Sequence, residues 1–169
     1  MGYSIICQLE GLPLTEDRHG PIVRYTDPKY HGYLANISPS VFHRQFEDSL
    51  PISMTGEMFL DRYGKHADPA TNILPGHTYK IRANTKYAVL ENSRVTLFYQ
   101  LLKGCTGDHP GGFGLYGQLG ELMYQSHDAY TECGLGSSAT SQIVDLVRAL
   151  GPESGVFGAK ITGGGAGGM

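Results

Sequence analysis

The stretch that most constrains the fold is a glycine-rich run from Gly155 to Gly168. Its first part, residues 156–162, alternates small or apolar side chains with polar ones and includes β-branched residues, which predicts a β-strand. Five glycines among residues 163–168 allow positive φ and close approach of the backbone to an anion. A strand leading into such a loop indicates either a phosphate neighbourhood or a tight structural turn.

Two common nucleotide-binding motifs do not explain this run. Gly163, Gly165 and Gly168 have the spacing of G-x-G-x-x-G, but the dinucleotide fingerprint needs a helix at the last glycine, and the sequence ends at Met169. The P-loop motif is absent, because no glycine is followed by Lys-Ser or Lys-Thr. The sequence therefore predicts neither motif.

Composition predicts a soluble globular protein with many turns. Of the 169 residues, 40% are hydrophobic, 17% are charged and 24 are glycine. A net charge of −3 and a pI of about 6.1 favour neither nucleic acid nor an anionic membrane as a partner. Cys7, Cys105 and Cys133 form no C-x-x-C pair and are odd in number, which favours reduced thiols and a cytoplasmic location. No membrane span or signal peptide is recognisable, so no membrane partner is expected.

Periodicity predicts helices and strands along the whole chain. Helices are expected near residues 38–50, 55–64, 86–103, 115–128 and 140–150, with loops at 65–76 and 104–114. Residues 3–9 fit a helix or a strand, and a short strand is expected at 22–25. The predicted fold class is α+β, a small antiparallel sheet that contains residues 79–82 and 156–162 and is covered on one side by helices. A solvated face is expected for Lys80, Arg82, Lys86 and Arg94.

Residue types that can form a catalytic triad or a metal site occur in the chain, but not in the arrangement that these sites require. Ser126, His127 and Asp128 are consecutive, and consecutive helical residues point about 100° apart, so they cannot form a hydrogen-bonded triad. The seven histidines include no i,i+4 pair, so no metal site is predicted.

A second Gly/Ser run, residues 133–140, leads into the predicted helix near Thr140. Free N–H groups at a helix N-terminus can bind an anion, whereas Ser137, Ser138 or Thr140 could equally cap the helix. Gly163 follows Ser138 by 25 positions, so a helix and a return strand fit between the two runs.

Taken together, these motifs resemble the C-terminal domain of sugar kinases of the GHMP superfamily, most closely its L-arabinokinase-like and galactokinase-like members. The resemblance covers nearly the whole chain. It rests on residues 32–39, 87–92, 94–95, 119–123, 126–127, Tyr130, 133–137, 158–165 and 167–168.

The resemblance implies that residues 1–169 are a single domain, the C-terminal portion of a kinase that lacks its N-terminal ATP-binding domain. The complete enzyme would use ATP and Mg²⁺ to phosphorylate the anomeric hydroxyl of a monosaccharide. The glycine run corresponds to the third family motif, beside the phosphates. The residues implied to lie there are Gly163, Gly164, Gly165, Gly167 and Gly168, with Thr162 and Ser137 as hydroxyl donors.

Residues 134–139 resemble the family's second motif, the phosphate loop Gly-Leu-x-Ser-Ser-Ala. In the family this motif lies in the other domain, far from the third motif, so we assign residues 133–138 to a turn of the C-terminal domain itself.

The chain also departs from the family pattern. The first motif, the ATP-cradling second motif, the catalytic aspartate and the strand after the glycine loop have no counterpart in residues 1–169. Phosphoryl transfer needs these parts together, so we expect no turnover by this chain alone. The alternatives are a non-catalytic ligand-binding or regulatory module derived from such kinases, and an independent nucleotide-binding protein.

Overall fold

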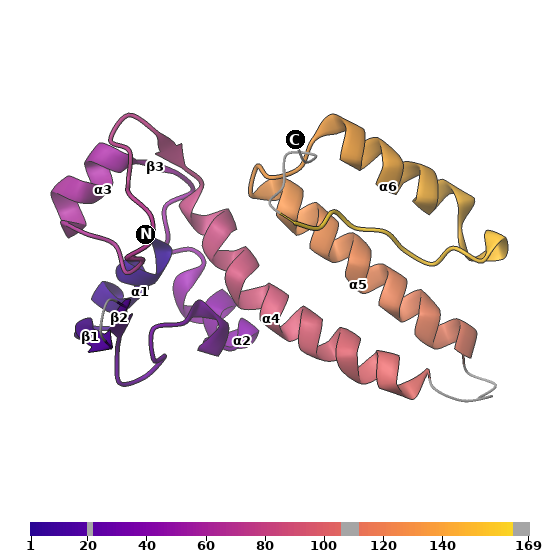
Figure 1. The fold of residues 1–169 in the computed structure, drawn as a ribbon, viewed down its shortest axis with the longest axis horizontal. Helices are drawn as coiled ribbons and strands as arrows, with labels where there is room; N and C mark the ends of the chain where they lie inside the picture. The colour runs from indigo at the N-terminus through magenta and orange to yellow at the C-terminus, as the bar shows by residue number, and fades with distance from the viewer. Residues whose placement is uncertain (20–21, 106–111, 164–169) are drawn as a thin grey trace. The chain divides into compact units, whose positions relative to one another are not determined.

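The structure, a computed structural model, describes residues 1–19, 22–105 and 112–163. The chain divides into two compact units, Met1–Leu90 (unit 1) and Glu91–Met169 (unit 2). Figure 1 shows the elements of both. Helices and short antiparallel strands occur together, which agrees with the predicted α+β class.

Unit 1 combines short helices with two small sheets. Its elements are α1 (Gly2–Leu9), β1 (Thr15–His19), β2 (Ile22–Thr26), η1 (Leu34–Asn36), α2 (Pro39–Val41), the π-helical turn η2 (Phe42–Phe46), β3 (Met54–Thr55), α3 (Gly56–Tyr63), β4 (Thr78–Tyr79) and the start of α4 (Ile81–Gly104). Thr55 caps α3 by accepting a hydrogen bond from the Met58 N–H, and Gly64 ends the helix with a φ of 73°.

The strands of unit 1 form two separate antiparallel pairs. β1 pairs with β2, with Thr15 opposite Thr26, and β3 pairs with β4, with Met54 opposite Tyr79. The prediction of one sheet containing both residues 79–82 and 156–162 is therefore wrong. Neither pair includes the glycine-rich run.

The core of unit 1 is built on α1 and the first turns of α4. Its fully buried side chains include Ile6, Phe42 and Phe59. Ile81, Thr85 and Val89 recur every four residues on α4, and each is at most 3% exposed. This buried stripe explains why the predicted strand at residues 79–82 ends at Tyr79. Helical spacing from Ile81 onward buries more apolar surface than a two-residue alternation would.

Unit 2 consists of the remainder of α4 with α5 (Gly112–Glu132), α6 (Ser138–Leu150) and the 3₁₀ turn η3 (Pro152–Ser154). Helices α5 and α6 are antiparallel neighbours (Figure 1), with the Arg148 guanidinium 4.5 Å from the Tyr124 ring centroid and Val144 buried. Ser137 and Thr140 form a reciprocal capping box at the start of α6. The capping interpretation of the second Gly/Ser run is therefore confirmed.

Residues 156–162 have no regular secondary structure and form no strand. A strand requires a hydrogen-bonded neighbour, and among residues 1–19, 22–105 and 112–163 none pairs with this segment. The prediction of a β-strand at residues 156–162 is therefore wrong.

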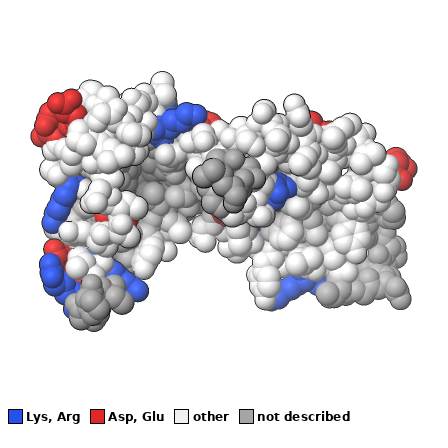
Figure 2. Space-filling model, turned by 45° about the horizontal axis from the view of Figure 1, so that its top comes forward, with Lys and Arg blue, Asp and Glu red and all other residues white. Residues whose placement is uncertain are grey.

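Charged side chains are scattered over the face shown in Figure 2, where uncharged surface dominates. No large patch of one sign is visible on that face. Within the described part of the chain, no helix has both the length and the apolar character required to cross a bilayer.

Candidate functional site

The candidate site lies in unit 2, where residues 156–163, hereafter the anchored segment, run alongside α5 (Figure 1). At its start the segment passes directly over Gly120. A Cβ atom at Gly120 would lie 1.7 Å from the Phe157 carbonyl oxygen, and one at Gly158 would lie 2.4 Å from the Gly120 Cα. Only glycine at both positions permits this approach. The tilted rings of Tyr116 and Phe157, with centroids 5.3 Å apart, add a contact nearby.

The other end of the segment is held by Tyr130. Its hydroxyl donates a 2.7 Å hydrogen bond to the Gly163 carbonyl, and Gly163 has a φ of +81°. The ten residues of α5 from Gly120 to Tyr130 span about 15 Å, which six residues of non-helical chain can bridge without being fully extended. The entry into the glycine run is therefore fixed relative to α5.

A charge cluster holds the middle of the segment. One carboxylate oxygen of Glu91 on α4 accepts hydrogen bonds from the Ser126 hydroxyl at 2.5 Å and the Lys160 ammonium at 3.3 Å. Its other oxygen accepts from the guanidinium of Arg94. The side chains of Glu91 and Arg94 are only 15% and 12% exposed. A largely desolvated carboxylate with three donors thus joins α4, α5 and the anchored segment.

Glu91 is ionised in this setting. Burial is the largest single influence on its pKa and raises it, but the Ser126 hydrogen bond and the charges of Arg94 and Lys160 together hold the pKa below the usual glutamate value. Arg94 and Lys160 carry two positive charges and Glu91 one negative charge, so the cluster has a net charge of +1 beside the anchored segment.

A hollow of about 260 Å³ opens beside the cluster. Its wall is mostly apolar, with the charged groups and Thr162 at its edge. The lining residues are Glu91, Arg94, Val95, Phe98, Leu122, Met123, Ser126, Lys160 and Thr162. Thr162 is exposed, and no described residue hydrogen-bonds to its hydroxyl, which can therefore donate to a ligand.

The predicted site residues fall into three groups. Thr162 and Gly163 lie together at the end of the anchored segment. Ser137 caps α6, with its hydroxyl 3.2 Å from the Thr140 N–H. The predicted contributors Gly164, Gly165, Gly167 and Gly168 lie outside the described residues.

Ser126, His127 and Asp128 face three different partners, as helix geometry predicted. Ser126 donates to Glu91, the His127 Nε2 lies 3.5 Å from the Ser141 hydroxyl, and Asp128 lies 3.5 Å from Arg148. They form no triad. Among the described residues, no group of three or more His, Cys, Asp or Glu side chains is placed to hold a metal ion.

The sequence interpretation missed the roles of Arg94 and Lys160. Arg94 was expected on a solvated face, but its side chain is nearly buried against Glu91. The i,i+3 spacing of Glu91 and Arg94 on a predicted helix was the available signal. Nothing in the local sequence indicates that Lys160, 69 residues away from Glu91, completes the cluster.

Comparison with known proteins shows that the sequence of this chain is similar to that of a sugar kinase. No protein-family model matches it. One curated relative is 39% identical over 142 residues, which covers 80% of this chain. That relative is the L-arabinokinase of Arabidopsis thaliana, and the chain spans only 13% of its length. The predicted relationship to a sugar kinase is therefore supported over most of the chain.

Proposed function

We propose that residues 1–169 form the C-terminal portion of an ATP-dependent sugar kinase of the GHMP superfamily, which phosphorylates the anomeric hydroxyl of a monosaccharide. The identity to L-arabinokinase supports this proposal, and the name of that relative makes L-arabinose the first sugar to test. The chain acts together with an N-terminal domain that cradles the nucleotide.

The observation that carries the proposal is the anchored segment. Three contacts, at Gly120, Glu91 and Tyr130, fix a stretch of backbone that ends at Gly163 with a positive φ. Backbone N–H groups of a glycine-rich loop bind phosphate well only when the loop leaves a rigid support. The helices of unit 2 support the segment as far as Gly163, and the proposal assigns phosphate binding to Gly163, Gly164, Gly165, Gly167 and Gly168.

The described residues include groups that suit phosphate binding, but they include no set of Mg²⁺ ligands. Thr162 offers a hydroxyl, and the Lys160 and Arg94 charges exceed that of Glu91 by one. Mg²⁺, which neutralises the phosphates of ATP in phosphoryl transfer, has no ligand set among these residues. The resemblance to GHMP kinases implies that the Mg²⁺ ligands and the catalytic base belong to the N-terminal domain, and the proposal assigns them there.

Calorimetric titration of the purified chain with ATP and Mg²⁺, with and without L-arabinose or galactose, tests whether nucleotide binding requires the N-terminal domain. We expect no measurable nucleotide binding by the folded chain. Joining the chain to a GHMP N-terminal domain should then restore phosphorylation of the sugar, with Thr162→Ala as a variant that lowers the rate.

Two results would contradict the proposal in different ways. Micromolar ATP binding by residues 1–169 alone would make the chain an independent nucleotide-binding protein. Failure of the joined protein to phosphorylate any monosaccharide, with both parts folded, would favour a non-catalytic module derived from such kinases.

A further inference from the structure

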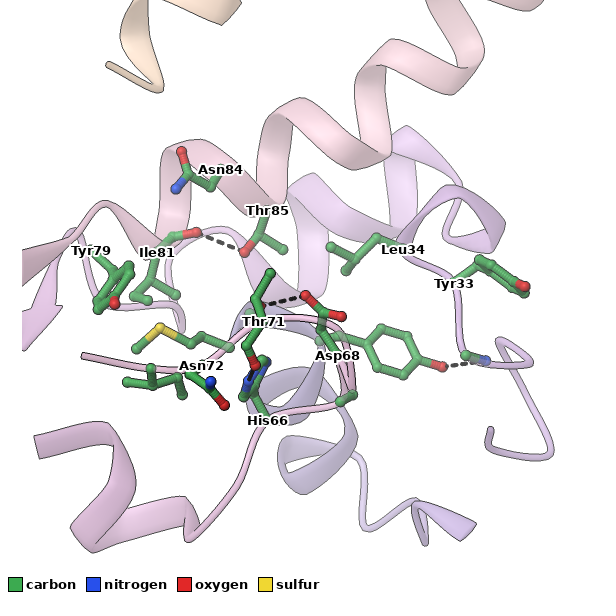
Figure 3. A pocket seen from close by; sticks show the side chains of 16 residues that line it. Tyr33, Leu34, His66, Asp68, Thr71, Asn72, Tyr79, Ile81, Asn84 and Thr85 are labelled. Carbon is green, nitrogen blue, oxygen red and sulfur yellow. Dashed lines mark hydrogen bonds between the residues drawn. The ribbon is translucent and has the colours of Figure 1, made fainter. Parts of the chain in front are cut away.

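Both units contain a hollow large enough for a small ligand, and the two hollows differ in how their polar groups are arranged. The larger, of about 420 Å³, lies in unit 1 between the first turns of α4 and the loop of residues 66–73 (Figure 3). Two of its hydroxyl groups are bonded to neighbours, because Thr71 donates to Asp68 at 2.6 Å and Thr85 donates to the Ile81 carbonyl at 2.7 Å. Acidic, basic and neutral side chains alternate around this hollow, so its lining favours no single class of ligand.

The hollow of about 260 Å³ in unit 2 separates apolar from charged groups. Its wall consists of Val95 and Phe98 from α4 and of Leu122 and Met123 from α5. Phe98, Leu122 and Met123 are half-buried and Val95 is 58% exposed, so the wall keeps apolar surface in contact with water. Since small-molecule sites usually measure about 300–1,000 Å³, a hollow of this volume suits a small ligand.

Hydrogen-bond donors gather at the edge of this hollow. The Lys160 ammonium donates one hydrogen bond to Glu91, at 3.3 Å, and its other N–H groups have no acceptor among the described residues. The Thr162 hydroxyl, two residues further along the anchored segment, is exposed and likewise has no described partner. Arg94 is bonded to Glu91 through Nη1, and no described residue accepts from its Nε or Nη2. The edge therefore has more donors than acceptors.

The charge at this edge favours an anion. Both carboxylate oxygens of Glu91 already accept hydrogen bonds, one from Ser126 and Lys160 and the other from Arg94. Among the described residues that line the hollow, Glu91 is the only acid, so one of the two cations is not neutralised. The Arg94 side chain is only 12% exposed, and partial burial strengthens the attraction of its charge for a bound anion.

We propose that the hollow of unit 2 binds a small amphipathic anion, with an apolar body of about phenyl size on the wall and one carboxylate at Lys160 and Thr162. A neutral molecule would leave the donors unpaired, and a small polar anion would leave the wall exposed to water. The inference goes beyond the proposed function, because phosphate contacts leave the apolar wall unused. It requires neither ATP nor an N-terminal domain.

The test is an NMR titration of the ¹⁵N-labelled 169-residue chain with 3-phenylpropionate, 3-phenylpropan-1-ol and acetate, all without ATP. The alcohol shares the apolar body of 3-phenylpropionate, and acetate shares its carboxylate. We expect saturable shifts at Val95, Met123 and Thr162 with 3-phenylpropionate. The alcohol should bind about tenfold more weakly, because it cannot form charge-assisted hydrogen bonds, and acetate should bind at least as weakly as the alcohol.

Variants test the two parts of the hollow separately. Val95→Asn should weaken binding of 3-phenylpropionate about threefold, because the wall loses apolar contact area. Leu97→Asn is the matched control, since Leu97 lies on the same helix, is 50% exposed and does not line the hollow. Thr162→Val removes the hydroxyl with little change in volume and should weaken binding about threefold.

Three outcomes would overturn the proposal. These are no saturable shifts with 3-phenylpropionate in a folded chain, equal affinity for the acid and the alcohol, and equal effects of Val95→Asn and Leu97→Asn. None of them bears on ATP binding or turnover, so this test and that of the kinase function fail independently.

Discussion

Replacing Gly120 by alanine should loosen the anchored segment. The new Cβ would lie 1.7 Å from the Phe157 carbonyl oxygen, so that oxygen must retreat by about 1.7 Å to reach an ordinary contact of 3.4 Å. Overpacking of this kind costs about 1–3 kcal/mol. Alanine is also a better helix former than glycine by about 1 kcal/mol, which offsets part of the cost. The net destabilisation of unit 2 is therefore about 0–2 kcal/mol.

Gly117 on the same helix is the matched control, because a Cβ there would meet nothing within 4 Å. Gly117→Ala should stabilise unit 2 by up to about 1 kcal/mol. The two variants share the gain in helix propensity, so the difference between them, about 1–3 kcal/mol, isolates the clash with the anchored segment.

Urea denaturation followed through NMR signals of unit 2, such as that of Val144, measures both variants. In Gly120→Ala, the signals of Lys160 and Gly163 should also shift, since the segment moves. Equal stability of the two alanine variants would refute the close approach of Gly158 to α5, and with it the rigid support on which the phosphate site depends.

Three further predictions concern single side chains. Glu91→Gln should destabilise unit 2 by about 1–3 kcal/mol in urea denaturation, because Arg94 and Lys160 lose the anion that accepts their hydrogen bonds. Folding lowers the pKa of Glu91, so the ionised carboxylate stabilises unit 2 fully above its unfolded-state pKa near 4.5. This stabilisation is lost as the pH falls through the lower folded-state pKa. The stability of the Glu91→Gln variant should not show this part of the pH dependence. Ser137→Ala should cost about 1 kcal/mol through loss of the cap, and Ser138→Ala much less, as measured by denaturation monitored on α6. Cys7, which is 1% exposed and whose pKa burial raises to about 11, should react with iodoacetamide much more slowly than Cys105 or Cys133, as followed by mass spectrometry; equal rates would contradict its burial.

The helices were predictable because each carries its own local signals. Ser137 before α6 and Thr55 before α3 are capping residues, and Gly64 ends α3 in a conformation that favours glycine. The stripe of Ile81, Thr85 and Val89 was also available, but the alternation of Tyr79 to Arg82 was read as a strand. A short apolar run at the boundary of a helix or strand fits the helical and the strand period equally well. Only the burial of its side chains in the folded protein decides between them.

The sequence brought part of the candidate site to attention. Thr162 and Gly163, expected from composition and from the resemblance to sugar kinases, lie together at the end of the anchored segment, whereas Ser137 caps α6. That Tyr130 donates to Gly163, or that Lys160 meets Glu91, could not be foreseen, because these pairs are 33 and 69 positions apart. Pairing at such distances depends on how the helices pack, which no local pattern encodes.

The sequence by itself determined the α+β class, the capped helices, the absence of a triad at residues 126–128 and the sugar kinase relationship. The first three follow from residue types at short spacing, where chain geometry is nearly fixed, and the last follows from the resemblance of several motifs to a known family. Only the tertiary structure decided that residues 156–162 lie on α5 without a ladder partner among the described residues, and that a buried carboxylate holds them there. The physical reason is that β-pairing and ion pairing both need a partner brought from elsewhere in the chain, and packing alone supplies it.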